Sequence, residues 1–257
     1  MSNLIADLSP TERAKYTTAY HAAQMVENGM KVGLGTGSTA AWLVKILGKR
    51  VRDEGLEFVG VPTSTRTAEL AREVGITLST LDDLGWLDLT IDGADEFDPD
   101  FNLIKGGGGA HLQEQIVASA SDKMVVIADA NKEVQTLGAF KLPVEVIPFG
   151  MRSTQTQIEK LLNGQDVDGR STALRMNGDQ PFVSDEGNYI IDLDLKRIGN
   201  AVELSNALNQ IAGVVENGLF IDICDAVVVG HPDGRVTEMR KGEPAIEAQV
   251  DLDGASV

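Results

Sequence analysis

The stretch Lys31-Val32-Gly33-Leu34-Gly35-Thr36-Gly37-Ser38-Thr39-Ala40 decides the fold. Its short apolar run, residues 31–34, predicts a strand, and a helical pattern follows over residues 40–51. The glycines between them allow a sharp turn and a close approach of the backbone to a ligand. Because the N-terminus of the next helix offers unpaired amides, this strand–turn–helix unit is typical of an anion-binding site.

Apolar strands and helices continue to alternate around this unit. Such alternation predicts an α/β fold, a doubly wound and mostly parallel sheet covered by helices on both faces. Further strands are expected at residues 58–61, 87–91, 124–128 and 226–229, and helices at residues 11–26, 66–74 and 112–121.

The pattern changes after Pro143. The expected elements then follow the order β-α-β-β-α-β, which is typical of an α+β ferredoxin-like unit. We therefore expect a smaller domain at residues 141–220, inserted into a Rossmann-like catalytic domain formed by residues 1–140 and 221–257. The strands of the insert are expected at residues 144–147, 172–176, 189–195 and 214–220, and its helices at residues 154–162 and 201–211.

Composition excludes several classes of protein. The 257 residues are 42% hydrophobic and 24% charged, which is ordinary for a globular chain. The net charge of −17 disfavours nucleic acid as a partner. No apolar run approaches the roughly 20 residues that span a membrane, and the N-terminus does not resemble a secretory signal. Because the single cysteine, Cys224, cannot form an internal disulfide, we expect a cytoplasmic protein.

The first glycine segment on its own also fits a dinucleotide-binding fingerprint. That function requires an acidic residue about twenty positions further on, at the end of the second strand. Here Val61 leads instead into Pro62-Thr63-Ser64-Thr65, whose hydroxyls suit a sugar or a phosphate better. The sequence therefore favours a sugar-phosphate ligand over a dinucleotide.

Asp92-Gly93-Ala94-Asp95-Glu96 follows the expected strand at residues 87–91. Ligands of doubly wound sheets gather at the carboxyl ends of the strands, where these carboxylates transfer protons or bind hydroxyls. Aspartate is also an ordinary turn residue, and from this segment alone a magnesium site stays open.

Lys105-Gly106-Gly107-Gly108-Gly109 is the least ordinary segment. Four glycines cost entropy on folding and pack against nothing, so we interpret them as a backbone cradle for a ligand. Glu114 falls in the first turn of the next helix, where an acid usually just stabilises the helix dipole. Lys132 follows another strand and can reach a phosphate as a point charge.

The three histidines, His21, His111 and His231, have no metal-like spacing. His111 lies close to the cradle, and we interpret it as a supporting or incidental residue. No metal ligand set and no cofactor site is expected.

Six segments together resemble the ribose-5-phosphate isomerase type A family: GLGTGSTA, PTSTRTAELA, TIDGADEFD, LIKGGGGAHLQEQIV, IADANKEV and LPVEVIPFG. The resemblance runs from about Thr11 to Glu238. It implies interconversion of ribose 5-phosphate and ribulose 5-phosphate in the pentose phosphate pathway. It also implies catalysis without a metal or other cofactor, and a homodimer or higher oligomer.

The resemblance also implies roles for residues. Glu114 matches the catalytic base of the family, and Asp92, Asp95 and Lys105 match other active-site positions. The implied substrate and phosphate contacts are Thr36, Gly37, Ser38, Thr39, Gly93, Ala94, Gly106, Gly107, Gly108, Lys132 and, in a less distinctive helix, Lys15. The family often has alanine at one of the positions 106–109, and His111 and Gln113 fall at variable positions.

The implied chemistry agrees with the residue types. One carboxylate, Glu114, can take a proton from C2 and return it to C1 through a cis-enediolate. Lys105 and the cradle amides are candidates to stabilise the developing negative oxygen, and Asp92 to assist ring opening. The alternatives are an amino-sugar phosphate deaminase or coenzyme A transferase of similar architecture, and a non-enzymatic sugar-phosphate sensor. The DGADE and KGGGG segments disfavour the first two, and the absence of an attached DNA-binding pattern disfavours the sensor.

Overall fold

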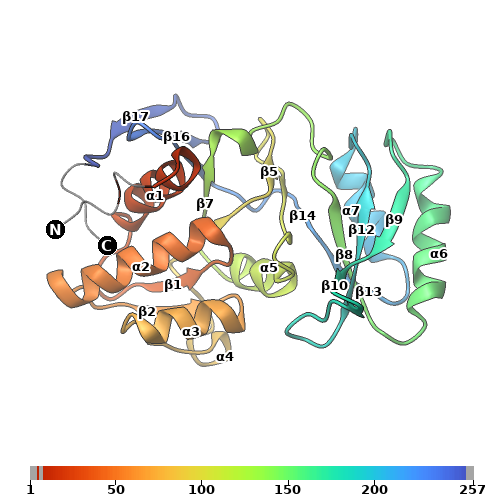
Figure 1. Cartoon of the computed structure of the whole chain (residues 1–257), viewed down its shortest axis with the longest axis horizontal. Coiled ribbons are helices and arrows are strands. Elements are labelled where there is room, and N and C mark those ends of the chain that lie inside the picture. Colours follow the sequence, from red (N-terminus) through yellow and green to blue (C-terminus); the bar gives the residue numbers. More distant parts are fainter. Residues whose placement is uncertain (1–4, 6–7, 253–257) are drawn as a thin grey trace. The chain divides into compact units, whose positions relative to one another are not determined.

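The computed structural model describes residue 5 and residues 8–252 (Figure 1). The chain divides into two compact units. The first comprises residues 1–93, 116–132 and 223–257, and the second comprises residues 94–115 and 133–222. The chain passes between the units at Gly93–Ala94, within a helix at Gln115–Ile116, at Lys132–Glu133 and at Asp222–Ile223.

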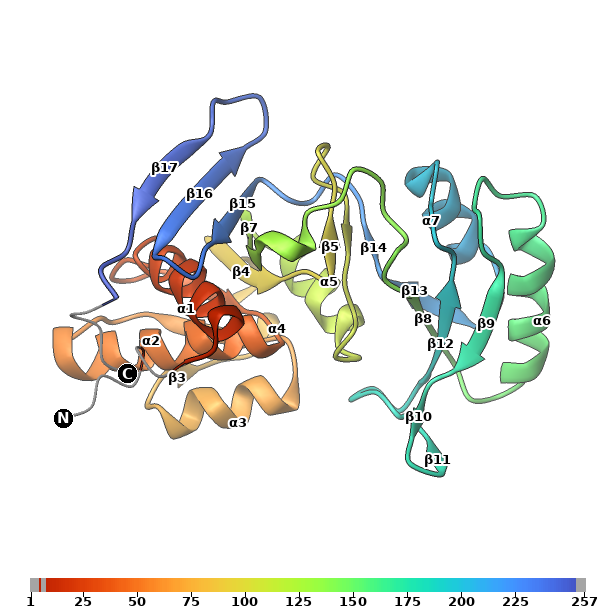
Figure 2. The ribbon, with the colours of Figure 1, turned by 45° about the horizontal axis from the view of Figure 1, so that its top comes forward.

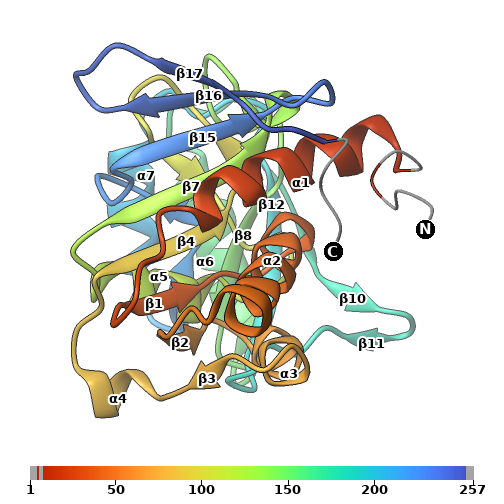
Figure 3. The same ribbon diagram turned by 90° about the vertical axis from the view of Figure 1, so that its left-hand side faces the viewer.

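The first unit is built on an eight-stranded sheet, whose strands Figure 3 shows in the order β17-β16-β15-β7-β4-β1-β2-β3. Neighbours from β15 to β3 pair in parallel, whereas β16 and β17 form an antiparallel hairpin at one edge (Figure 2). The expectation of a mostly parallel α/β sheet is confirmed. The strands are β1 (Lys31–Leu34), β2 (Val59–Pro62), β3 (Thr77–Leu78), β4 (Leu89–Gly93), β7 (Met124–Asp129), β15 (Ala226–Gly230), β16 (Arg235–Arg240) and β17 (Ile246–Gln249).

Helices cover both faces of this sheet. One face buries Val32 and Leu34 in a core shared with α1 (Pro10–Ala23), α2 (Ser38–Glu54) and α3 (Thr65–Glu73). Gly33, between those two residues, points to the other face, where Val117 of α5 (His111–Ser119) packs with Val61 and Leu87. The short helix α4 (Leu81–Leu84) contributes to that second cluster.

The second unit contains a four-stranded antiparallel sheet in the order β13-β8-β12-β9. Every second residue of β8 and β12, Val144 and Ile191 among them, packs against α6 and α7 in one apolar core, so both helices cover the same face. The elements are β8 (Leu142–Val146), α6 (Met151–Leu162), β9 (Ser171–Leu174), β12 (Tyr189–Asp194), α7 (Ala201–Asn209) and β13 (Val214–Asn217).

Two smaller sheets complete the second unit. A three-stranded sheet has the order β14-β6-β5, with β5 at Glu96–Phe97, β6 at Leu103–Ile104 and β14 at Leu219–Phe220. A hairpin joins β10 (Met176–Asn177) to β11 (Gln180–Pro181). No helix in the described part of the chain is long and apolar enough to cross a membrane.

Several predicted elements need correction. The strand expected at residues 214–220 is two strands in different sheets, because the chain changes sheets at Gly218. The N–H of Gly218 bonds to the Pro143 carbonyl, and a Cβ there would lie 2.4 Å from the Lys105 carbonyl oxygen. The strands β16 and β17 were not predicted beyond the turn at Pro232. The short elements β3, α4, β10 and β11 were also missed, because two to four residues carry too little periodicity.

Candidate active site

Three adjacent strands of the first unit, β1, β4 and β7, end at the same edge of the sheet. Because β1 continues to β2 on one side and lies beside β4 on the other, the strand order reverses at this point. Ligands of doubly wound sheets bind at such a switch point. The segment Gly35–Thr39, Asp92 and the 3₁₀ turn η1 (Ala130–Lys132) all lie at this edge.

Asp92 is the fully buried carboxylate of this edge. It was predicted to follow its strand, but it lies within β4 as the next-to-last residue. Its Oδ1 accepts hydrogen bonds from the backbone N–H groups of Thr36, at 2.9 Å, and Gly93, at 2.7 Å. Gly35 makes this contact possible, since a Cβ there would overlap the Asp92 side chain. The first glycine segment therefore packs against the Asp92 carboxylate and donates a hydrogen bond to it.

The predicted hydroxyl-rich segment contacts the same turn. The Thr36 hydroxyl lies 2.8 Å from the hydroxyls of both Thr63 and Ser64, and 3.1 Å from that of Thr67. The Thr67 hydroxyl in turn donates to the Gly35 carbonyl. These buried hydroxyls therefore brace the glycine turn, whereas the sequence suggested that they would bind the ligand directly.

The N-terminus of α2 is the part of this turn that stays accessible. Its N-cap, Gly37, has a φ of 131° and forms no side-chain cap, and Ser38 is exposed. The first amides of a helix without a side-chain cap favour an anion, helped by the helix dipole. Gly37, Ser38 and Thr39 thus lie where an anion is favoured, and their contact with a phosphate stays a prediction.

Two lysines were predicted as phosphate contacts in this unit. Lys15 of α1 forms an ion pair with Glu12 at 2.8 Å, and Glu12 accepts a hydrogen bond from the Trp42 indole in the second turn of α2. The hydrogen bond from Lys15 lowers the pKa of the Glu12 carboxyl. This chain of contacts ties Lys15 to the N-terminal part of α2. Lys132 is half-buried at the end of η1.

The second unit holds the remaining predicted residues. Lys105 follows β6 and Glu114 lies in the first turn of α5, and both side chains are at least 95% buried. Lys105 Nζ lies 3.3 Å from Glu114 Oε2 and 5.3 Å from the centroid of the Phe220 ring. Removing one member of such a buried pair would leave an uncompensated charge. The structure thus brings together the two charged residues that the sequence grouped around the cradle.

The glycine segment lies between Lys105 and α5. Gly106 and Gly109 have φ values of 96° and 78°, which residues with a Cβ rarely adopt. The Asp95 carboxylate accepts a hydrogen bond from the Gly107 N–H at 2.7 Å. Asp95 therefore helps to hold the cradle in place, and the substrate contact that the resemblance implies for Asp95 stays a prediction. Gly107 and Gly108 are exposed, and Gly93 and Ala94 are half-buried in their respective units.

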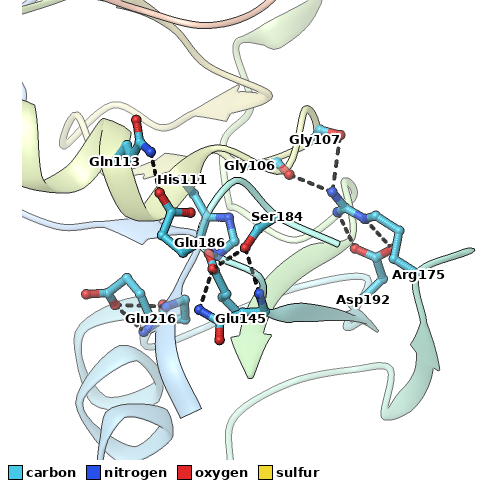
Figure 4. Close-up of polar contacts among 12 residues, drawn as sticks. Gly106, Gly107, His111, Gln113, Glu145, Arg175, Ser184, Glu186, Asp192 and Glu216 are labelled. Atoms are coloured by element: carbon cyan, nitrogen blue, oxygen red, sulfur yellow. Dashed lines mark hydrogen bonds and ion pairs between the residues drawn. The ribbon is translucent and has the colours of Figure 1, made fainter. Parts of the chain in front are cut away.

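His111 supports the cradle from below (Figure 4). Its ring is fully buried, and a Cβ on Gly106 would lie 2.8 Å from Nδ1. Burial, reinforced by the nearby cations of Arg175 and Lys105, lowers the pKa of His111 to about 3, so the ring is neutral at ordinary pH. Its Nε2 lies 3.8 Å from Glu145 Oε2, and burial raises the pKa of that carboxyl.

Sequence reasoning missed Arg175 and Phe182, which also contact the cradle, and Asp192, which pairs with Arg175. Arg175 donates to the Gly106 and Gly107 carbonyls, and Phe182 occupies the space that a Cβ on Gly109 would need. Their segments carry no motif. The only signal was charge inside a strand, since Asp192 interrupts the apolar run at residues 190–193.

No group of three or more His, Cys, Asp and Glu residues suited to hold a metal ion was found among the described residues. The charged and polar groups that the two units bring to the predicted positions are carboxylates, lysines and backbone amides. A doubly wound sheet with a helix N-terminus open to an anion, and with a buried carboxylate at the same edge, is typical of enzymes that bind phosphorylated metabolites.

Comparisons with known proteins identify the family. The family model for ribose 5-phosphate isomerase A (phosphoriboisomerase A) matches residues 59–234. The ribose-5-phosphate isomerase A of Ruegeria pomeroyi is 69% identical over 233 residues, which cover 91% of this chain and 89% of that protein. The solved structure of ribose 5-phosphate isomerase A from Methanocaldococcus jannaschii has a TM-score of 0.82 and 40% identity, and the match covers 90% of this chain and 99% of that one.

A second solved structure is a D-ribose-5-phosphate isomerase in complex with phospho-erythronic acid. It has a TM-score of 0.84 and 38% identity, with coverage of 90% of this chain and 100% of that one. The chain therefore belongs to the ribose 5-phosphate isomerase A family. The family predicted from the six segments is confirmed, and with it the isomerase activity on ribose 5-phosphate and ribulose 5-phosphate.

Proposed function

We infer that Glu114 is the base of this isomerisation. The reaction moves a hydrogen between C2 of ribose 5-phosphate and C1 of ribulose 5-phosphate through a cis-enediolate. A single carboxylate performs both transfers if it is held near the two carbons. Glu114 has the required setting, because it is buried, fixed in the first turn of α5 and next to the glycine segment.

The observation that carries this assignment is the Lys105–Glu114 pair, with its 3.3 Å separation inside the protein. An enediolate carries negative charge on an oxygen, and a fixed cation stabilises that charge as it develops. We assign this role to Lys105, together with the amides of Gly106 and Gly108, whereas Gly107 is proposed only as a substrate contact, because its N–H donates to Asp95. One buried pair then supplies both the base and the electrostatic partner of the intermediate.

Asp92 and the first glycine segment are assigned to ring opening and to substrate binding. Asp92 is proposed to move protons among the sugar oxygens, and Gly93, Ala94 and Asp95 are proposed as substrate contacts. The amides of Gly37, Ser38 and Thr39, the turn at Thr36, and the ammonium groups of Lys132 and Lys15 are proposed to bind the phosphate. A phosphate held away from the reacting carbons supplies positioning energy.

The base is tested with Glu114→Gln, which keeps the size of the side chain but cannot accept the proton. We expect phospho-erythronic acid to bind this variant and turnover to fall at least about a hundredfold, as general-base contributions predict. In deuterated water the native enzyme is expected to place deuterium on C1 of ribulose 5-phosphate, and the variant is not. Turnover near the native rate would place the base elsewhere.

We also propose a domain division and an assembly for this chain. A ferredoxin-like domain at residues 141–220, inserted between residues 1–140 and 221–257, is supported by the strand order β13-β8-β12-β9 with two helices on one face. The family resemblance supports a homodimer. The free cysteine, Cys224, which is buried, supports a location in the reducing cytoplasm. Light scattering on the purified protein tests the dimer, and a monomeric mass with full activity would contradict it.

A further inference from the structure

One face of the four-stranded sheet is turned toward the glycine segment. Helices α6 and α7 cover the face that carries Val144 and Ile191, so the alternate residues Glu145, Ile190 and Asp192 point the other way. In the second unit that opposite face meets His111 and the segment at residues 106–109 (Figure 4). We call this face of the sheet the platform. It packs against the cradle, and the polar side chains of Glu145 and Asp192 project from it.

Arg175 forms the main polar link between this platform and the cradle. It lies between β9 and β10, and its Nε donates to Asp192 Oδ2 at 3.0 Å while Nη2 donates to Oδ1. Its Nη1 donates to the Gly106 carbonyl at 2.9 Å and to the Gly107 carbonyl at 3.3 Å. The planar guanidinium thus uses one edge for the carboxylate and keeps the other for two successive peptide groups (Figure 4).

These contacts fix the direction of two peptide groups. In a trans peptide the carbonyl and the N–H point in opposite directions. The first group is held at both ends, because Arg175 binds the Gly106 carbonyl and Asp95 binds the Gly107 N–H. In the second group Arg175 binds the Gly107 carbonyl, so the Gly108 N–H points away from Arg175.

The Gly108 N–H is the donor that this arrangement leaves for a ligand. Gly108 is exposed, and within the described residues its N–H has no hydrogen-bond partner. Glycine loses more conformational freedom on ordering than any other residue, so a mobile glycine segment is costly to order when a ligand binds. A donor that is already oriented spares this cost at the moment of reaction.

We propose that Arg175, oriented by Asp192, is a positioning residue for the isomerase, which holds the Gly106 and Gly107 carbonyls so that the Gly108 N–H donates to an oxygen of the sugar phosphate. Arg175 itself does not touch the substrate in this proposal. The proposal rests on the assignment of the glycine segment to substrate binding. Arg175 lies outside the six segments that resemble the family, so the proposal adds a new residue to those that shape the site.

Arg175→Ala tests the proposal, with Arg197→Ala as the matched control. Arg197 also pairs with two aspartates of the second unit, Asp166 and Asp168, but it makes no contact with the cradle. We expect Arg175→Ala to lower kcat for ribose 5-phosphate by about tenfold to a hundredfold, the range expected for a small misplacement of catalytic groups. Arg197→Ala is expected to stay within about twofold of the native enzyme, as surface ion pairs contribute little.

A purely structural role is separated from positioning by chemical rescue. Guanidinium at millimolar concentration should restore kcat of Arg175→Ala, whereas sodium chloride of equal ionic strength should not. In ¹⁵N-labelled protein, phospho-erythronic acid should shift the Gly108 amide resonance of the native enzyme and shift it much less in Arg175→Ala. An unchanged kcat, or an equal shift of Gly108 in both proteins, overturns the proposal.

Arg175→Lys keeps the proposal testable if Arg175→Ala does not fold. Lysine retains the charge opposite Asp192 but lacks the planar fork that spans two carbonyls, so about a tenfold loss of kcat is expected. Native kcat in Arg175→Lys, with a native Gly108 shift, would overturn the proposal. Failure of the underlying site assignment is visible separately, as native turnover in Glu114→Gln.

Discussion

Gly35 and Asp92 approach so closely that residue 35 has no room for a side chain: a Cβ there would lie 2.1 Å from Asp92 Oδ1. The glycine of the first motif is therefore required by a neighbouring strand as well as by the ligand-binding turn. Asp92 is held against that turn by the Thr36 N–H. The position of one proposed proton-transfer group thus depends on the absence of one methyl group.

Gly35→Ala is expected to destabilise the protein by about 1–3 kcal/mol, because the added methyl overpacks a buried site. It should also lower kcat by about a hundredfold, since Asp92 must move. Urea unfolding and turnover of ribose 5-phosphate measure the two effects. Gly164→Ala is the control, because a Cβ there lies an ordinary 3.7 Å from the Leu161 carbonyl oxygen. Native activity in Gly35→Ala would show that the position of Asp92 is not critical.

A second prediction concerns Gly109, the last glycine of the cradle. A Cβ on Gly109 would lie 2.5 Å from the Phe182 ring, and its φ is 78°. Gly178 also has a positive φ, 60°, but has open space around it. Gly109→Ala should therefore be more destabilising than Gly178→Ala, by about 1–3 kcal/mol for the overpacking.

The ring contact is isolated by a double substitution. In Gly109→Ala/Phe182→Leu the smaller side chain should recover most of that difference, so the effects of the two single variants should not add. Thermal or urea unfolding of the four proteins measures the coupling. Strict additivity would mean that Gly109 is required only for its backbone angle.

A third prediction concerns the phosphate. Lys132→Ala should weaken binding of ribose 5-phosphate about tenfold, in line with the loss of one charge-assisted hydrogen bond of roughly 1.5–3 kcal/mol. Binding of unphosphorylated ribose should change much less. Lys123→Ala, an exposed lysine just before β7, serves as the control. Equal losses for the two sugars would remove Lys132 from the phosphate site.

Metal removal gives a fourth prediction. The proposed chemistry uses a carboxylate base, a lysine and amides, so activity should survive exhaustive dialysis against EDTA within about twofold of the untreated enzyme. The loss is measured before and after addition of Mg²⁺, Mn²⁺ or Zn²⁺. Activity that disappears on dialysis and returns with one of these ions would require a metal in the mechanism.

Regular elements and motif positions were predictable because each leaves a local signal. The apolar run at Lys31–Leu34 coincides with β1. The glycine turn indicated that a helix follows, and α2 begins at Ser38 with Gly37 as its N-cap. Lys105 and Glu114 were grouped correctly because they lie only nine positions apart in the sequence. The resemblance to a known family then supplied roles that no single spacing could supply.

Contacts between distant segments were not predictable in this way. Arg175 bonds to Gly106, which lies 69 positions earlier in the sequence, and no local pattern at either residue predicts this contact. Asp95 and the hydroxyls of Thr63 and Ser64 were assigned to the ligand because polar groups at a sheet edge usually bind one. In the folded chain these groups also bond to the glycine turns, which the sequence did not indicate, since flexible backbone needs partners to stay ordered.

A final prediction follows from the buried ring of His111, whose pKa falls from the ordinary 6.5 to about 3 on folding. Below pH 6.5 the unfolded chain takes up a proton at this residue and the folded chain does not. As the pH is lowered below 6.5, the free energy of unfolding therefore decreases, by up to about 1.4 kcal/mol per pH unit from this group. Glu145 acts in the opposite direction, because its pKa is raised on folding and protonation favours the folded state.

His111→Leu removes the histidine contribution and leaves Glu145 in place. The native protein should lose stability between pH 6.5 and pH 5 more steeply than this variant, and the two urea midpoints should converge as the pH falls. Unfolding midpoints at a series of pH values measure both proteins. Parallel curves for the native protein and His111→Leu would mean that His111 takes up its proton equally in the folded and unfolded chains, so the ring would not be held neutral beneath the cradle.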